Sequence, residues 1–171
     1  AQATGQQHWL SVLCKFRDVA EEPYSPGFHA DCYGPGYPRL GHFWSELSYE
    51  ALAITGTVAG ARWYTLPQPL AHYVTDSDGD GEPDLLQSQR AAEDCTAAAA
   101  ADVHFPDYDG IQLAFNHELA GYAQGGTRWM LLDGEGRAWR MTWLPDWAIA
   151  NLGVTEHEMG HALGLPHSVG T

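Results

Sequence analysis

The residues best suited to carry out chemistry lie near the end of the chain, from His157 to His167. They have the form His-Glu-x-x-His-x-x-Gly-x-x-His. On a helix, His157 and His161 stand about one turn apart on the same face, where two imidazoles can bind one zinc ion. Gly164 lets the chain reverse with a positive φ, and this turn returns His167 as a third nitrogen ligand. We therefore predict a zinc site formed by His157, His161 and His167.

Glu158, which follows the first histidine, has the position of a general base. Three protein nitrogens leave one position of a tetrahedral zinc ion free, which is typical of catalytic zinc sites. Zinc lowers the pKa of water toward ~7, so Glu158 can take the proton and later give it to the leaving amine. The pattern predicts hydrolysis of peptide bonds by metal-activated water.

Surface histidines placed on a helix by chance are the alternative interpretation. With this composition, the five fixed residues are expected in about two of ten thousand such sequences, which makes chance a weak explanation. A second run, from His117 to Gly121, begins with His-Glu but has glycine where the second ligand should stand. We interpret that run as unrelated to metal binding.

An acidic loop matches the first nine positions of a calcium-binding loop, with carboxylates at positions 1, 3, 5 and 9 and glycine at position 6. The candidate ligands are Asp76, Asp78, Asp80, Glu82 through its backbone carbonyl, and Asp84. Position 12 is Gln87, which cannot supply the bidentate carboxylate of a calcium sensor, so we predict a structural calcium site. An acidic turn that caps the following helix is the alternative.

The three cysteines, Cys14, Cys32 and Cys95, permit one disulfide. We favour Cys14 with Cys95, because one lies in an expected core strand and the other in an expected core helix. Cys32 then lies in a loop rich in Gly and Pro, as a free, modified or otherwise bonded thiol. A thiolate that blocks the zinc is a less favoured interpretation.

Positioning these residues requires strands and helices together, so we predict an α+β fold. Strands are predicted at His8–Arg17, Gly56–Leu66, Leu70–Val74, Gly110–Asn116, Arg128–Asp133 and Arg137–Leu144, the last two as a hairpin. Helices are predicted at Phe43–Tyr49, Asp84–Ala101 and Ala148–Leu163. The first strand carries one uniformly apolar set of side chains, which indicates a sheet with one buried face.

Composition limits the classes of protein to which the chain can belong. Its 171 residues, 44% of them hydrophobic, suit one core, and we predict a single domain over residues 1–171. The net charge of -14, with Lys15 as the only lysine, argues against nucleic acid and anionic membranes as partners. No stretch approaches the roughly 18 consecutive apolar residues of a membrane span.

The zinc motif resembles that of the metzincin clan of metallopeptidases, in the form found in matrixin-like and bacterial secreted members. Four other runs are similar to bacterial exported metallopeptidases of the immune-inhibitor-A type: Cys14–Asp18, Phe43–Tyr49, Trp63–Pro69 and Thr142–Pro145. The resemblance implies a secreted protein with a zincin-like fold, in which a twisted mixed sheet packs on a backing helix and an active-site helix. It also implies a peptide substrate that lies extended along an edge strand.

One family feature is missing from the sequence. Metzincins carry a methionine-containing turn downstream of the third histidine, whereas Met130, Met141 and Met159 all precede His167. We therefore expect a truncated, cleaved or incompletely represented catalytic domain, which a second chain with the remaining C-terminal part would complete.

The function that fits these observations best is a secreted zinc endopeptidase acting on extended polypeptide. One alternative is an inactive fragment or degenerate relative that keeps the metal and serves as a binding or structural module. A calcium-dependent adhesion module with an incidental histidine motif is the other.

Overall fold

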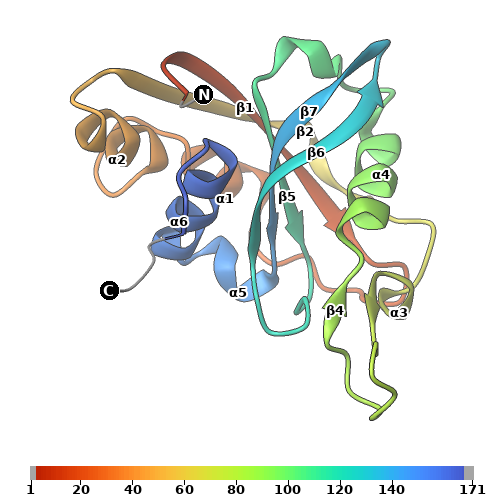
Figure 1. The fold of residues 1–171 in the computed structure, drawn as a ribbon. Helices are drawn as coiled ribbons and strands as arrows, with labels where there is room; N and C mark the ends of the chain where they lie inside the picture. Colours follow the sequence, from red (N-terminus) through yellow and green to blue (C-terminus); the bar gives the residue numbers. More distant parts are fainter. Residues whose placement is uncertain (1–2, 168–171) are drawn as a thin grey trace.

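The centre of the computed structural model, which describes residues 3–167, is a five-stranded sheet of order β2-β1-β5-β7-β6 (Figure 1). The strands are β1 (Gly5–Lys15), β2 (Leu52–Thr65), β5 (Gly110–Phe115), β6 (Gln124–Leu132) and β7 (Glu135–Leu144). β1 pairs in parallel with β2 and β5, and β5 pairs in parallel with β7. β6 runs antiparallel to β7 and forms one edge of the sheet.

Helices cover both faces of this sheet. Between β1 and β2 lie α1 (Pro26–Asp31) and α2 (Leu40–Leu47); between β2 and β5 lie α3 (Leu70–Tyr73), α4 (Ser88–Ala99) and the 3-10 turn η1 (Phe105–Asp107); after β7 come α5 (Asp146–Ile149) and α6 (Leu152–Ala162). The connection from β1 to β2 moves in one direction along the sheet, and the connection from β2 to β5 moves in the other. Because connections between parallel strands are right-handed, the helices of these two connections lie on opposite faces of the sheet. α4 therefore covers one face, while α2 and α6 cover the other (Figure 1).

β1 is buried on both of its faces. Leu10 and Val12 pack in the same cluster as the alanines of α4, whereas Trp9 packs with Met159 of α6 and Trp44 of α2. The expectation of one buried face was therefore wrong. A central parallel strand between two helical layers needs apolar contacts on both sides, and a tryptophan provides one of them.

Several predicted elements are confirmed with shifted ends, and others are corrected. The run Leu70–Val74 is not a strand: α3 begins after Pro69, whose fixed φ suits the residue before a helix, and only Val74 continues into a strand. The long helix begins at Ser88, because Leu85 and Leu86 pair with β3 (Val74–Thr75) instead.

The predicted helix Ala148–Leu163 is two helices. Its break falls at Asn151, whose side chain accepts a hydrogen bond from the Val154 amide and caps α6. Helix α1 was not predicted, although Ser25 followed by Pro26 is a typical helix start, and its Ser25 side chain accepts from the Phe28 amide.

Cys14 and Cys95 form a disulfide that joins β1 to α4. Cys32 is buried at the end of α1, where its thiol donates to the Phe28 carbonyl. It lies at the end of a helix and not in the expected open loop, so the sulfur is engaged inside the α1 region. No described helix has the length and apolarity to cross a membrane.

Candidate metal centre

Helix α6 holds the histidines at the surface because its opposite face is buried. Met159 and Ala162 are almost fully enclosed against the sheet and α2, while His157 is exposed and His161 half-buried. This one-sided burial fixes the rotation of the helix about its axis. As a result, the i and i+4 imidazoles face outward together.

A glycine turn closes α6 and returns the chain toward the same face. Gly164 has a φ of 98°, and its amide donates to the His161 carbonyl at 3.0 Å. The Leu165 amide donates to the Gly160 carbonyl at 2.9 Å. Together these two bonds form a Schellman motif, which requires a left-handed residue at the position of Gly164. The reversal brings His167 beside the helix.

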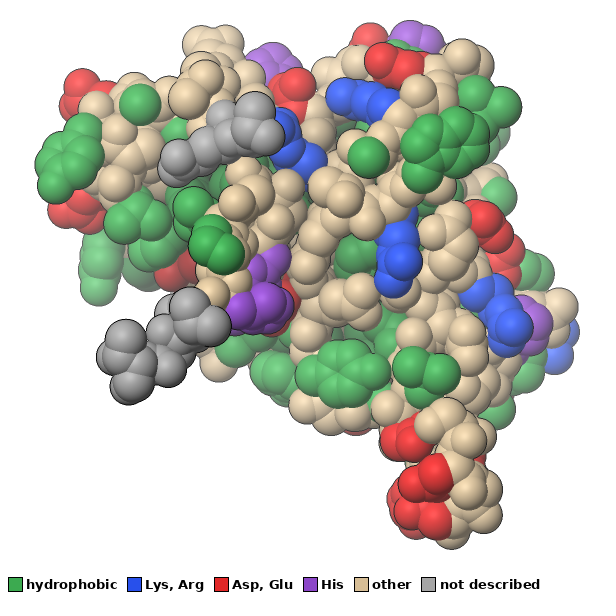
Figure 2. Space-filling model, viewed as in Figure 1, with side chains coloured by type: hydrophobic (Ala, Val, Ile, Leu, Met, Phe, Trp, Pro, Cys, Tyr) green, Lys and Arg blue, Asp and Glu red, His purple; other side chains and the backbone are tan. Residues whose placement is uncertain are grey.

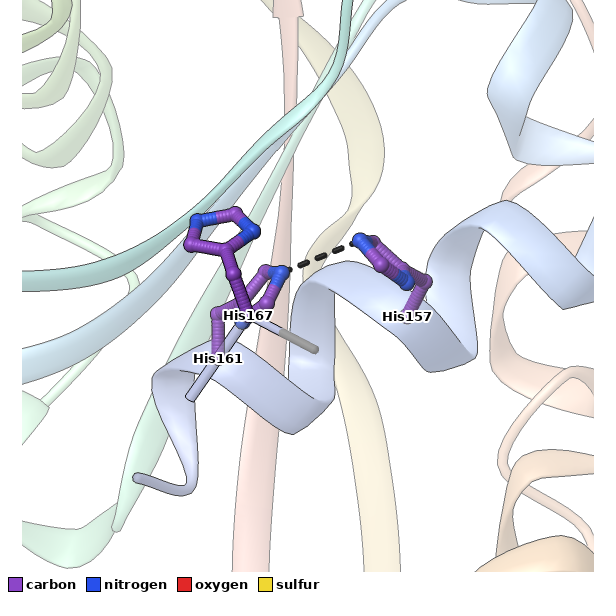
Figure 3. A group of neighbouring side chains, drawn as sticks. All are labelled: His157, His161 and His167. Atoms are coloured by element: carbon purple, nitrogen blue, oxygen red, sulfur yellow. Dashed lines mark hydrogen bonds between the residues drawn. The ribbon is translucent and has the colours of Figure 1, made fainter. Parts of the chain in front are cut away.

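The three imidazoles point toward one another (Figure 3). Their ligand nitrogens all lie within 4.8 Å of one another, and the Nε2 atoms of His157 and His161 are 3.0 Å apart. Two nitrogens bound at about 2.0–2.1 Å to one tetrahedral zinc ion lie roughly 3.3 Å apart. The donor set and its spacing therefore fit a zinc ion.

The turn also orients one of the ligands. Nδ1 of His161 lies 3.0 Å from the carbonyl oxygen of Leu165. Because a carbonyl can only accept, this contact places the proton on Nδ1 and leaves the Nε2 lone pair toward the other histidines. Such outer partners commonly fix the ring orientation of metal-binding histidines.

Glu158 projects from the same helix, half-buried. Within residues 3–167, no hydrogen bond or ion pair engages its carboxylate. The start of β6 approaches α6 at this level: a Cβ added to Gly125 would lie 1.9 Å from the Glu158 carbonyl oxygen. Sequence reasoning missed this contact, although the pair Gly125-Gly126 inside a strand is a signal of close backbone approach.

Glu156 is a second acidic residue beside the ligands. Its side chain faces the groove between α2 and α6. Burial raises the pKa of the Glu156 carboxyl above its usual value. The motif itself gave no reason to single out this residue.

The predicted calcium loop lies between β3 (Val74–Thr75) and β4 (Leu85–Leu86) and projects from the body of the molecule as an acidic tip (Figures 1 and 2). Carboxylate oxygens of Asp76, Asp78 and Asp80 lie within 4.8 Å of one another. Asp84 does not join this group, because its carboxylate accepts from the amide and hydroxyl of Ser77, both at 2.7 Å.

Backbone bonds prearrange one of these aspartates. Asp76 accepts from the amides of Gly81 and Gly79 at 2.8 and 2.7 Å. These bonds lower the pKa of the Asp76 carboxyl. The side chain of Glu82 lies outside this group of carboxylates.

The His-Glu run at His117 has a structural role. One oxygen of Glu118 accepts from the amides of Leu119 and Gly121 at 2.8 Å, and the other accepts from the Trp147 indole at 2.5 Å. The carboxylate thus braces the loop before β6 against α5. His117 does not belong to either group of candidate metal ligands.

No protein-family model and no curated protein matches this chain.

Proposed function

We propose that the chain is a zinc-dependent endopeptidase. The observation that carries this proposal is the convergence of three imidazoles whose ligand nitrogens lie within 4.8 Å of one another. Glu158 follows the first of these histidines in the sequence, and none of the described residues forms a hydrogen bond or ion pair with its carboxylate. A structural zinc site would be closed by a fourth protein ligand. The described residues place no fourth His, Cys, Asp or Glu in this group.

The roles of the residues follow from their chemistry. His157, His161 and His167 would hold the ion through one nitrogen each. When bound, zinc polarises a carbonyl oxygen and lowers the pKa of water. The Glu158 carboxylate takes the proton of the attacking water and passes it to the nitrogen of the leaving amine.

The surroundings of α6 support a zincin-like arrangement with an extended substrate. Among residues 3–167, β6 pairs only with β7, to which it is antiparallel, so its other edge presents amides and carbonyls that no described strand pairs. Its start touches α6 at the Gly125–Glu158 contact. A peptide added to this edge as a further strand would pass the histidines, with its backbone held in register.

We also propose an extracellular location and a structural calcium ion. The Cys14–Cys95 disulfide supports an oxidising compartment. The group of Asp76, Asp78 and Asp80 supports calcium, because hard cations prefer several carboxylate oxygens. A bound ion would tie the projecting loop to β3 and β4.

The test compares the parent chain with Glu158→Gln, and with Glu93→Gln as a matched control on the opposite face of the sheet. Zinc content and cleavage of a quenched peptide library are measured for all three. We expect about one zinc per chain in each, and a loss of at least ~100-fold in kcat/KM only for Glu158→Gln. Zinc binding without cleavage by the parent would contradict the peptidase and favour a metal-binding module.

A further inference from the structure

A groove between α2 and α6 runs up to the candidate metal centre. Its volume is about 350 Å³. Phe43, Trp44 and Leu47 of α2 form one wall, and the groove borders His157 and His161. Figure 2 shows apolar side chains gathered over α2, on the same side of the molecule as the histidines. This volume lies at the low end of the roughly 300–1,000 Å³ of small-molecule sites, which suits one side chain.

Two glycines keep the groove open. At Gly160, an added Cβ would lie 3.4 Å from both the Trp44 ring and the Leu165 side chain. At Gly153, an added Cβ would meet only the Asn151 side chain, at 3.5 Å. Larger residues at these positions on α6 would fill the space over the aromatic wall. The groove is therefore a product of glycine placement as well as of the α2 side chains.

A single carboxylate faces this apolar space. Glu156 lines the groove and is half-buried, and no side chain within residues 3–167 forms a hydrogen bond or ion pair with it. A partly desolvated charge without a partner is unfavourable, and a cation would offset the loss of water. The complement of this groove is a long aliphatic stem that ends in a positive charge.

We propose that the groove binds an arginine or lysine side chain of the polypeptide substrate, with Glu156 pairing its charge and the aromatic wall contacting its stem. That the bound side chain belongs to a substrate rests on the proposed peptidase function, whereas the binding itself does not. Phe43 and Trp44 add a favourable surface for a guanidinium or ammonium group. Because the groove borders two of the zinc ligands, the basic residue lies close to the bond that is cleaved.

Binding can be measured without catalysis. The zinc-loaded chain is titrated with N-acetyl-arginine amide and with N-acetyl-norleucine amide, and the amide resonances of Gly153 and Gly160 and the Trp44 indole resonance are followed by NMR. We expect these resonances to move when the arginine compound is added. The titrations should show that the chain binds this compound about five-fold more tightly than the norleucine compound. Glu156→Gln should remove that difference, whereas Glu93→Gln should keep it.

Cleavage gives the second readout. Peptides with arginine, norleucine or glutamate at each position near the scissile bond are compared for the parent and Glu156→Lys. The parent should prefer arginine at one position by about five-fold, and the variant should prefer glutamate there.

The outcomes separate the two proposals. If the NMR titrations give equal affinities for the arginine and norleucine compounds, the proposed binding of a basic side chain in the groove is overturned, even if peptides are cleaved. Resonances that move only at residues outside the groove would overturn it as well. Cleavage that depends on Glu158 but shows the same preference in Glu156→Lys would also overturn it. Arginine-selective binding in a chain without peptidase activity would keep the groove and reject the enzyme.

Discussion

The carbonyl oxygen of Leu165 lies 3.0 Å from Nδ1 of His161, so the turn that follows α6 also orients a ligand on it. The same turn carries His167 to the other two histidines. Closure of the helix and convergence of the three histidines therefore both depend on the conformation of Gly164.

Replacing Gly164 with alanine should lower both the stability of the chain and its affinity for zinc. Its φ of 98° disfavours any residue with a Cβ, and left-handed backbone costs an L-residue roughly 1–2 kcal/mol. A displaced Leu165 carbonyl should also lower zinc affinity by about 10–100-fold. Chemical unfolding and competitive zinc titration would measure these effects, with Gly27→Ala as a control at a position that needs no positive φ. Unchanged zinc affinity would show that the turn does not orient the site.

Gly125 and Gly126 provide a sharper pair of variants. A Cβ on Gly125 would collide with the Glu158 carbonyl oxygen at 1.9 Å, whereas one on Gly126 would meet nothing within 4 Å. We expect Gly125→Ala to lower the free energy of unfolding by about 1–3 kcal/mol and to displace α6 from β6. Gly126→Ala should be close to neutral. Equal stability of the two variants in urea unfolding would refute the described contact.

His29 should make stability depend on pH. Burial lowers its pKa to about 4 in the folded chain, against about 6.5 when unfolded. Between these values the unfolded chain binds more protons, so stability is fully present above about pH 6.5 and is lost as pH falls toward 4. The loss reaches about 3 kcal/mol, and it should be absent in His29→Leu. Parallel pH profiles of unfolding free energy for the two chains would contradict this.

Calcium should stabilise the chain through the acidic loop. At a concentration of calcium a hundred times its Kd, binding contributes about 2.7 kcal/mol, or roughly 5–10 °C in Tm for a chain of this size. Asp80→Asn keeps an acceptor for the Glu82 amide, which Asp80 now binds at 2.8 Å, but removes a charged ligand. It should abolish the shift in thermal melts, and Asp31→Asn should retain it. If the Tm of the parent chain does not change when calcium is added, the proposed calcium site is ruled out.

The convergence of the three histidines could be predicted from the sequence because their geometry is local. The spacing of His157 and His161 sets one helical face, and Gly164 sets the turn, so eleven residues suffice to place three imidazoles. The alternation of β1 and of the β6–β7 hairpin is local in the same way. The two-residue turn at Asp133 and Gly134 has positive φ at both positions, as the right-handed twist of a hairpin favours.

The remaining features depend on contacts between distant segments. The pair Gly125-Gly126 signals that some backbone approaches closely, but it does not show that the partner is α6. In the same way, nothing near Glu156 shows that Phe43 and Trp44 will form the other wall of its groove. The burial of both faces of β1 also depends on layers supplied later in the chain. Ser11 occupies one of those faces because its hydroxyl is satisfied by the Tyr33 hydroxyl at 2.7 Å.

The three-histidine centre is the claim on which the proposed activity depends, and X-ray absorption at the zinc edge tests it most directly. For the parent chain we predict about one zinc with three imidazole nitrogens at about 2.0–2.1 Å and one oxygen ligand, and one imidazole fewer in His167→Ala. A sulfur ligand at about 2.3 Å, a fourth protein nitrogen, or a spectrum unchanged by His167→Ala would contradict the proposed centre.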